Sequence, residues 1–189
     1  FGLGETYMLM GDQRKALQNF KKLATILLDE SLLEEAETVL NKIIEIQPDD
    51  INTLTQLADV YDRLGFENEV VATYEKINWI YLDKEAFNKV IEICNQILKI
   101  RPENIAAHEN LIYIYDRTNR RAEAIELWFK MADIYQHSEN LAKEEECYDA
   151  ILKKDNANVE ARRRHIFLLL KLSQKLAAFK EARILSDQY

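Results

Sequence analysis

Histidines, cysteines and clustered carboxylates are the side chains in this sequence that could support catalysis or bind a metal ion. The three histidines, His108, His137 and His165, are scattered along the chain, so none stands beside a nucleophile and an orienting carboxylate at catalytic spacing. We expect each of them on a helix surface or in a groove between repeats. No glycine-rich loop followed by lysine and serine is present to cradle a phosphate. The sequence therefore predicts a protein that is not an enzyme, with no catalytic residue and no cofactor.

The acidic and sulfur-containing side chains do not form a metal-binding pattern either. Successive helical residues point about 100° apart, so the run from Glu144 to Glu146 cannot converge on one ion. A solvated helix face is the better interpretation of that run. Cys94 and Cys147 lie 53 residues apart, and neither has a Cys or His at ligand spacing. We expect packed thiols in a reducing compartment, which favours a cytoplasmic location, and no metal site.

Composition and net charge restrict both the fold and the partners. The 189 residues are 48% hydrophobic and 31% charged, unlike a disordered chain. Four glycines and two prolines are too few for the tight turns of a β-sandwich or barrel. A net charge of −8 argues against general binding to nucleic acid or anionic lipid, and the longest apolar run, 166–170, is too short to cross a membrane. We therefore expect an all-α protein that binds no nucleic acid and does not insert into a membrane.

A repeat of 54 residues organises the chain. Pro48 and Pro102 lie 54 residues apart, and each closes an apolar helix pattern. The same interval brings Tyr-Asp-Arg at 61–63 onto an identical triplet at 115–117. A fixed period of this length is typical of helical-repeat proteins. The repeats are 1–50, 51–104, 105–158 and an incomplete 159–189.

Each complete repeat is expected to hold three amphipathic helices, because apolar residues recur at intervals of three and four. Polar joints and glycines, such as Gly11 and Gly65, separate the helices. This pattern predicts about eleven antiparallel helices in a single solenoid over 1–189, without a domain boundary. The sequence begins at Phe1 without a methionine and stops at Tyr189 within the pattern, so we expect a fragment of a longer protein.

The run Leu3-Gly4-Glu5-Thr6-Tyr7, followed by Gly11, Ala16, Phe20 and Leu23, resembles a tetratricopeptide repeat (TPR), a helix-turn-helix unit of 34 residues. Gly4 and Ala16 are small where two such helices approach closely. Tyr7 and Phe20 are large and would fill the space beside them, and Gly11 permits the turn. The resemblance extends over the whole chain and implies a right-handed αα superhelix, a TPR-like solenoid.

The chain departs from the regular TPR alternation in identifiable places. A second TPR-like set overlaps the first, so the middle helix of each repeat, 67–82 or 121–137, would serve two TPR pairs. Glu144 stands where the family has a small residue, and Asn156 replaces the closing proline. These departures bear on which helices line the concave face.

The resemblance also implies where a partner would bind, because the first helix of each TPR pair usually lines the concave surface. Exposed positions there combine arginines with aromatics, as interface hot spots do. The alternative is that each aromatic packs against a neighbouring helix. The residues one repeat before and after Trp79 are the polar Thr25 and Asp133. Trp79 is therefore either exposed for a partner or required by local packing. The candidate partner-binding residues are Asp59, Arg63, Trp79, Tyr113, Arg117, Arg163, Arg164 and Phe167.

Uneven charge indicates the chemistry of the partner. Residues 1–104 carry 11 Lys and Arg against 19 Asp and Glu, whereas 159–189 carry seven against three. The basic end is either a docking patch for an acidic partner or an ordinary solvated face. The sequence predicts a non-catalytic scaffold that binds a peptide or helix of a partner protein, acidic in character. The alternative is head-to-tail self-association, and an RNA-binding helical repeat is disfavoured by the net charge.

Overall fold

The computed structural model describes residues 2–187, and this part of the chain is built from α-helices without a strand. The chain ends Phe1 and Tyr189 lie outside the described residues. The predicted all-α fold with about eleven helices is confirmed. No helix within 2–187 combines the length and the apolar composition needed to cross a membrane. The helices are α1 (Gly2–Leu9), α2 (Gln13–Asp29), α3 (Leu33–Ile46), α4 (Ile51–Leu64), α5 (Glu67–Asp83), α6 (Phe87–Ile100), α7 (Ile105–Arg117), α8 (Arg121–His137), α9 (Leu141–Lys154), α10 (Val159–Lys171) and α11 (Lys175–Ser186).

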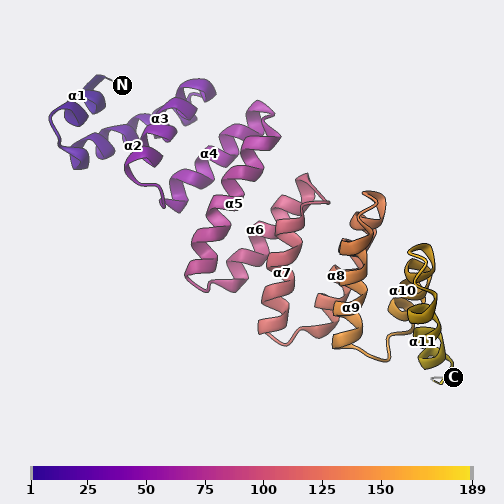
Figure 1. The fold of residues 1–189 in the computed structure, drawn as a ribbon. Helices are drawn as coiled ribbons and strands as arrows, with labels where there is room; N and C mark the ends of the chain where they lie inside the picture. Colours follow the sequence, from indigo (N-terminus) through magenta and orange to yellow (C-terminus); the bar gives the residue numbers. More distant parts are fainter. Residues whose placement is uncertain (1, 188–189) are drawn as a thin grey trace. The chain divides into compact units, whose positions relative to one another are not determined.

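The helices gather into two compact units, unit 1 up to Pro102 and unit 2 from Glu103. Unit 1 contains α1 to α6, and unit 2 contains α7 to α11. Inside each unit, helices that follow one another in the chain reverse direction at a short turn and pack together (Figure 1). The single solenoid over 1–189 stays a prediction.

Corresponding helices begin 54 residues apart. A residue and its counterpart 54 positions away, here called equivalents, therefore occupy the same place on helices of the same kind. This allows the repeats to be compared residue by residue. First helices begin at 51, 105 and 159, second helices at 13, 67, 121 and 175, and third helices at 33, 87 and 141.

Each turn between helices of one repeat contains a residue in the left-handed backbone region. Gly11 and Gly65 occupy it with φ of +75° and +78°, which glycine adopts without steric strain. The prediction that Gly11 permits a turn is confirmed. Other residue types hold the same conformation at a cost of roughly 1–2 kcal/mol each. They are Ser31, Glu85, Asn119, Glu139 and Ser173.

One core cluster of unit 1 lies between α2, α3 and α4, where apolar side chains such as Leu40 and Ile43 are fully buried. On α1, Gly4 lies directly against the ring of Phe20, which is 1% exposed. A Cβ added at Gly4 would come within 2.5 Å of that ring. The predicted contact of a small residue with a large one is therefore present at the first helix pair.

Both cysteines are buried free thiols, Cys94 on α6 and Cys147 on α9. Burial raises the pKa of each thiol to about 12, so both stay protonated near neutral pH. Cys94 also donates a weak hydrogen bond to the side-chain oxygen of Asn78 at 3.6 Å. The prediction of packed thiols is confirmed.

Candidate partner-binding site

Each first helix presents a line of exposed side chains spaced four residues apart. Residues at this spacing lie on the same face of a helix. The sequence predicts exposure at these positions, and the structure confirms it for all of them. The lines are Thr55, Asp59 and Arg63 on α4, Glu109, Tyr113 and Arg117 on α7, and Arg163, Phe167 and Lys171 on α10.

The candidate residues on α4 and α7 interact within their own helices, and Arg63 also reaches the turn between α2 and α3. Arg63 lies 3.8 Å from the carboxylate of Asp59 and donates a hydrogen bond to Ser31 Oγ at 3.2 Å. On α7, Arg117 donates a hydrogen bond to the Tyr113 hydroxyl at 2.9 Å, and its guanidinium lies 5.6 Å from the ring centroid. Tyr113 is 46% exposed. The aromatic and the arginine predicted to act together are thus held side by side.

The three aromatic candidates differ in their surroundings, but none is buried by packing. Trp79 on α5 is 74% exposed, and Phe167 on α10 is 72% exposed. Beside Phe167, Leu168 and Leu169 are buried. For Trp79 and Phe167, the alternative that the aromatic packs against a neighbouring helix is therefore wrong. Three of the eight candidates, Arg163, Arg164 and Phe167, lie together on α10.

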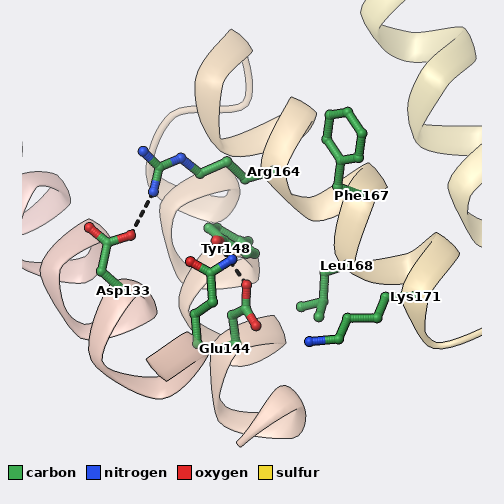
Figure 2. Close-up of a pocket in the computed structure, with 8 residues that line it drawn as sticks. Asp133, Glu144, Tyr148, Arg164, Phe167, Leu168 and Lys171 are labelled. Atoms are coloured by element: carbon green, nitrogen blue, oxygen red, sulfur yellow. Dashed lines mark hydrogen bonds and ion pairs between the residues drawn. The ribbon is translucent and has the colours of Figure 1, made fainter. Parts of the chain in front are cut away.

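A pocket of about 390 Å³ opens between α8, α9 and α10 in unit 2 (Figure 2). Phe167 stands at its edge with most of its ring in solvent, while Leu168 contributes a buried apolar surface. The other lining residues are polar. They are Asp133 and Gln136 from α8, Glu144 and Tyr148 from α9, and Arg164 and Lys171 from α10.

Arg164 of α10 forms an ion pair with a residue of α8 at this pocket. Its Nη1 lies 2.7 Å from Asp133 Oδ1, and its Nε donates to Glu160 Oε1 at 2.7 Å. The guanidinium also lies 5.4 Å from the ring centroid of Phe129. The hydrogen bond to Glu160 and the charge of Asp133 raise the pKa of Arg164, although partial burial opposes them. The charge of Arg164 is already compensated, whereas Lys171 forms no ion pair within residues 2–187.

A buried polar pair lines the pocket on α9. Glu144 is 3% exposed and accepts a hydrogen bond from the Tyr148 hydroxyl at 3.1 Å. Burial, followed by the charge of Glu144, raises the pKa of Tyr148. The interpretation of Glu144 as part of a solvated face is wrong, because helix geometry turns it inward while Glu146, two residues on, points to solvent. Within residues 2–187, no three His, Cys, Asp or Glu side chains are placed to hold a metal ion.

Comparison of the repeats would have found this pair. The equivalents of Glu144 are Ala36 and Val90, and those of Tyr148 are Leu40 and Cys94. All four equivalents are apolar or small and buried. The third repeat has therefore exchanged core side chains for a carboxylate and a phenol at the place where the pocket opens.

A buried arginine on α10 contacts the asparagine that replaces the closing proline. Arg162 is 1% exposed and forms an ion pair with Glu181 of α11. Its Nη2 also donates to the backbone and side-chain oxygens of Asn156, at 2.6 and 2.7 Å. Asn156 is the equivalent of Pro48 and Pro102, so the residue that departs from the TPR pattern supplies acceptors to this arginine. Of the three consecutive arginines at 162–164, only Arg163 makes no ion pair within the described chain.

Two of the three histidines are buried, so for these two the helix-surface alternative is wrong, and the alternative of a groove between repeats stays a prediction. His137 is exposed, whereas His108 and His165 are 4% and 6% exposed. Neither ring nitrogen of His165 has a hydrogen-bond partner, and its Nε2 lies 3.9 Å from carboxylate oxygens of Glu145 and Asp149. These contacts do not replace the hydrogen bonds to water that the ring of His165 loses on burial.

Substitution of His165 by leucine is expected to raise the free energy of unfolding by about 1–3 kcal/mol, because a buried polar group without a hydrogen bond is costly. Leucine is the residue at both equivalents, Leu57 and Leu111. The measurement is urea denaturation of the full chain. Leu111→His is the matched control and should destabilise. A His165→Leu variant no more stable than the parent would contradict the prediction.

The contacts and the turn of the first helix pair identify the type of helical repeat. Gly4 on α1 packs against Phe20 on α2, Gly11 reverses the chain between them, and α2 in turn packs against α3. These are the positions at which a TPR pair places its small residues, its large residues and its turn. The chain has a TPR-like fold. Its helices follow one another in groups of three instead of in pairs.

Solved structures of TPR proteins are similar to this TPR-like chain at low sequence identity. A putative kinesin light chain of Podospora anserina with nearly identical TPR-like repeats is 14% identical, with 91% of this chain and 94% of that chain covered and a TM-score of 0.44. A thermophilic TPR protein of Thermus thermophilus is 17% identical, with 82% and 99% covered and a TM-score of 0.30. MamA from Desulfovibrio magneticus is 13% identical, with 91% and 94% covered and a TM-score of 0.34. Neither a protein-family model nor a curated protein matches the sequence.

Proposed function

We propose that this TPR-like chain is a non-catalytic scaffold that binds a peptide or a helix of a partner protein along α10. The observation that carries the proposal is the ring of Phe167, which is 72% exposed at the edge of a pocket of about 390 Å³. A large aromatic side chain at the edge of a concave site is typical of a residue that contributes strongly to binding. Its burial by a partner would remove apolar surface from water.

Charge around Phe167 indicates how the partner would lie. Arg163 and Lys171 stand one turn to either side of Phe167, and neither forms an ion pair within the described chain. Inside the pocket, Glu144 and Asp133 would repel a carboxylate. We therefore expect an apolar side chain of the partner against Phe167 and Leu168, with its acidic residues at the rim. The same pairing of aromatic and basic side chains recurs at Tyr113 and Arg117 on α7.

Phe167→Ala is expected to weaken capture of a partner by about tenfold or more, because truncation of a central aromatic anchor costs more than about 1.4 kcal/mol. The measurement is affinity capture from lysate of the source cells with the full chain as bait, followed by quantitative mass spectrometry. Phe179→Ala is the matched control, since Phe179 is 68% exposed on α11, away from the pocket. Arg163→Glu should act like Phe167→Ala, and Arg164 is left intact because it joins α8 to α10.

Two outcomes would redirect the proposal. The surface formed by Arg163, Phe167, Leu168 and Lys171 is called the α10 surface here. Equal capture by the parent and by Phe167→Ala would show that this surface is not the binding site. Capture of only further copies of this protein, lost at high salt, would favour head-to-tail self-association instead. Lys175, Lys180 and Arg183 on α11, which form no ion pair within residues 2–187, would then be the basic side of that contact.

A further inference from the structure

Trp79 on α5 is an exposed aromatic that the α10 surface does not involve. Its side chain is 74% exposed, although tryptophan is on average a highly buried residue. Its equivalents Thr25 and Asp133 show that the fold does not require an aromatic side chain at this position. Packing within unit 1 therefore does not account for Trp79.

The indole of Trp79 lines a pocket of about 300 Å³ that also contains two free carboxylates. Asp49 lies in the turn between α3 and α4, and Asp83 is the last residue of α5. Both side chains are exposed, and neither forms an ion pair within residues 2–187. Lys84 is the one cation among the residues that line the pocket. The C-terminal end of α5, which carries the negative end of the helix dipole, lies at the same place.

These groups together favour a positively charged side chain. A guanidinium or ammonium group binds over an indole face by cation–π attraction, and flanking carboxylates add charge-assisted hydrogen bonds. The surrounding chain has the complementary charge, since residues 1–104 carry a net −8, which attracts cations over a longer range. We propose that the Trp79 pocket binds an arginine or lysine side chain from a basic segment of a partner protein. This site lies in unit 1, so it is distinct from the α10 surface in residues and in the charge that it selects.

Fluorescence of Trp79 provides a direct test. The sequence contains two tryptophans, so Trp128→Phe leaves Trp79 as the single tryptophan that emits. Phenylalanine is already the residue at Phe20, the equivalent of Trp128 two repeats earlier. The test titrates this variant with a nine-residue peptide of alternating arginine and alanine, and with a second peptide in which glutamate replaces arginine. We expect a saturable change in Trp79 emission with the arginine peptide and none with the glutamate peptide. Equal changes with both peptides would overturn the proposal.

Two variants separate a specific pocket from general attraction of a cation to an acidic unit. The double variant Asp49→Asn with Asp83→Asn is expected to lower the affinity for the arginine peptide by about threefold to tenfold. Trp79→Ala, measured by calorimetry, is expected to lower it by about tenfold. Glu34→Gln with Glu35→Gln removes the same charge from the exposed start of α3 and should change the affinity less than about twofold. Equal losses in the two charge variants, or unchanged affinity in Trp79→Ala, would overturn the proposal. Apart from Trp128→Phe, whose position does not line the pocket beside α10, every substitution lies in unit 1, so neither result bears on the α10 surface.

Discussion

Replacement of Glu181 by alanine is expected to lower the free energy of unfolding by about 3–5 kcal/mol. Glu181 is the ion-pair partner of Arg162, whose side chain is 2% exposed, so its removal leaves a buried positive charge uncompensated. The hydrogen bonds to Asn156 would remain, but the oxygens of Asn156 carry no net charge. Chemical denaturation of the full chain, followed by circular dichroism, measures the effect.

Two further variants test the assignment of this loss to the buried charge. Lys180→Ala, at an exposed neighbouring position on α11, should change stability by less than about 0.5 kcal/mol. Removal of both charges by Arg162→Leu with Glu181→Leu should cost far less than Glu181→Ala alone, because apolar replacement of a buried ion pair is often neutral or stabilising. Leucine is already present at Leu54, an equivalent of Arg162, and at Leu127, an equivalent of Glu181, and both leucines are buried. A double variant as unstable as Glu181→Ala would contradict this explanation.

Phe20→Ala is expected to lower the free energy of unfolding by a similar amount, about 3–5 kcal/mol. The ring is 1% exposed and belongs to the cluster formed by α2, α3 and α4. Its loss would open a cavity beside Gly4 that the neighbouring helices cannot fully close. Denaturation monitored by circular dichroism measures this loss as well.

A double-mutant cycle with Gly4 tests the contact itself. In the parent chain Gly4→Ala should cost about 1–3 kcal/mol, because the added Cβ would lie 2.5 Å from the Phe20 ring. In the Phe20→Ala background the same change should cost almost nothing, since the ring is absent. The two substitutions are therefore expected to be strongly non-additive. Additive losses would show that Gly4 and Phe20 do not meet as described.

Helix positions could be predicted closely from the sequence, because they depend on local periodicity and on breaks that the repeat marks several times over. The middle helices were expected at 67–82 and 121–137, and they are Glu67–Asp83 and Arg121–His137. The exposure of the α4, α7 and α10 lines is what the resemblance to TPR pairs implies, and the repeat carries it from one first helix to the next. A residue at a fixed phase of a helix in one repeat has the same phase in the next.

The environment of individual charges could not be predicted in the same way. Arg162, Arg163 and Arg164 are consecutive and chemically identical, yet one is buried, one is free and one bridges two helices. The difference depends on partners elsewhere in the fold, Glu181 on α11 and Asp133 on α8, which no local pattern indicates. Glu144 is a different case: a charged residue in an acidic run is expected to face water, but its buried equivalents Ala36 and Val90 already indicate an inward position.

Helices of one kind begin at a constant interval, and this constrains how the chain can change in length. Insertion or loss of a whole 54-residue segment would leave every later helix in phase with its neighbours, so that a first helix still follows a third. A segment of any other length would bring unlike helices together and misalign their apolar faces. Duplication or deletion within the gene is therefore expected to survive mainly in whole repeats, while point substitutions such as those at Glu144 and Arg162 diversify each copy.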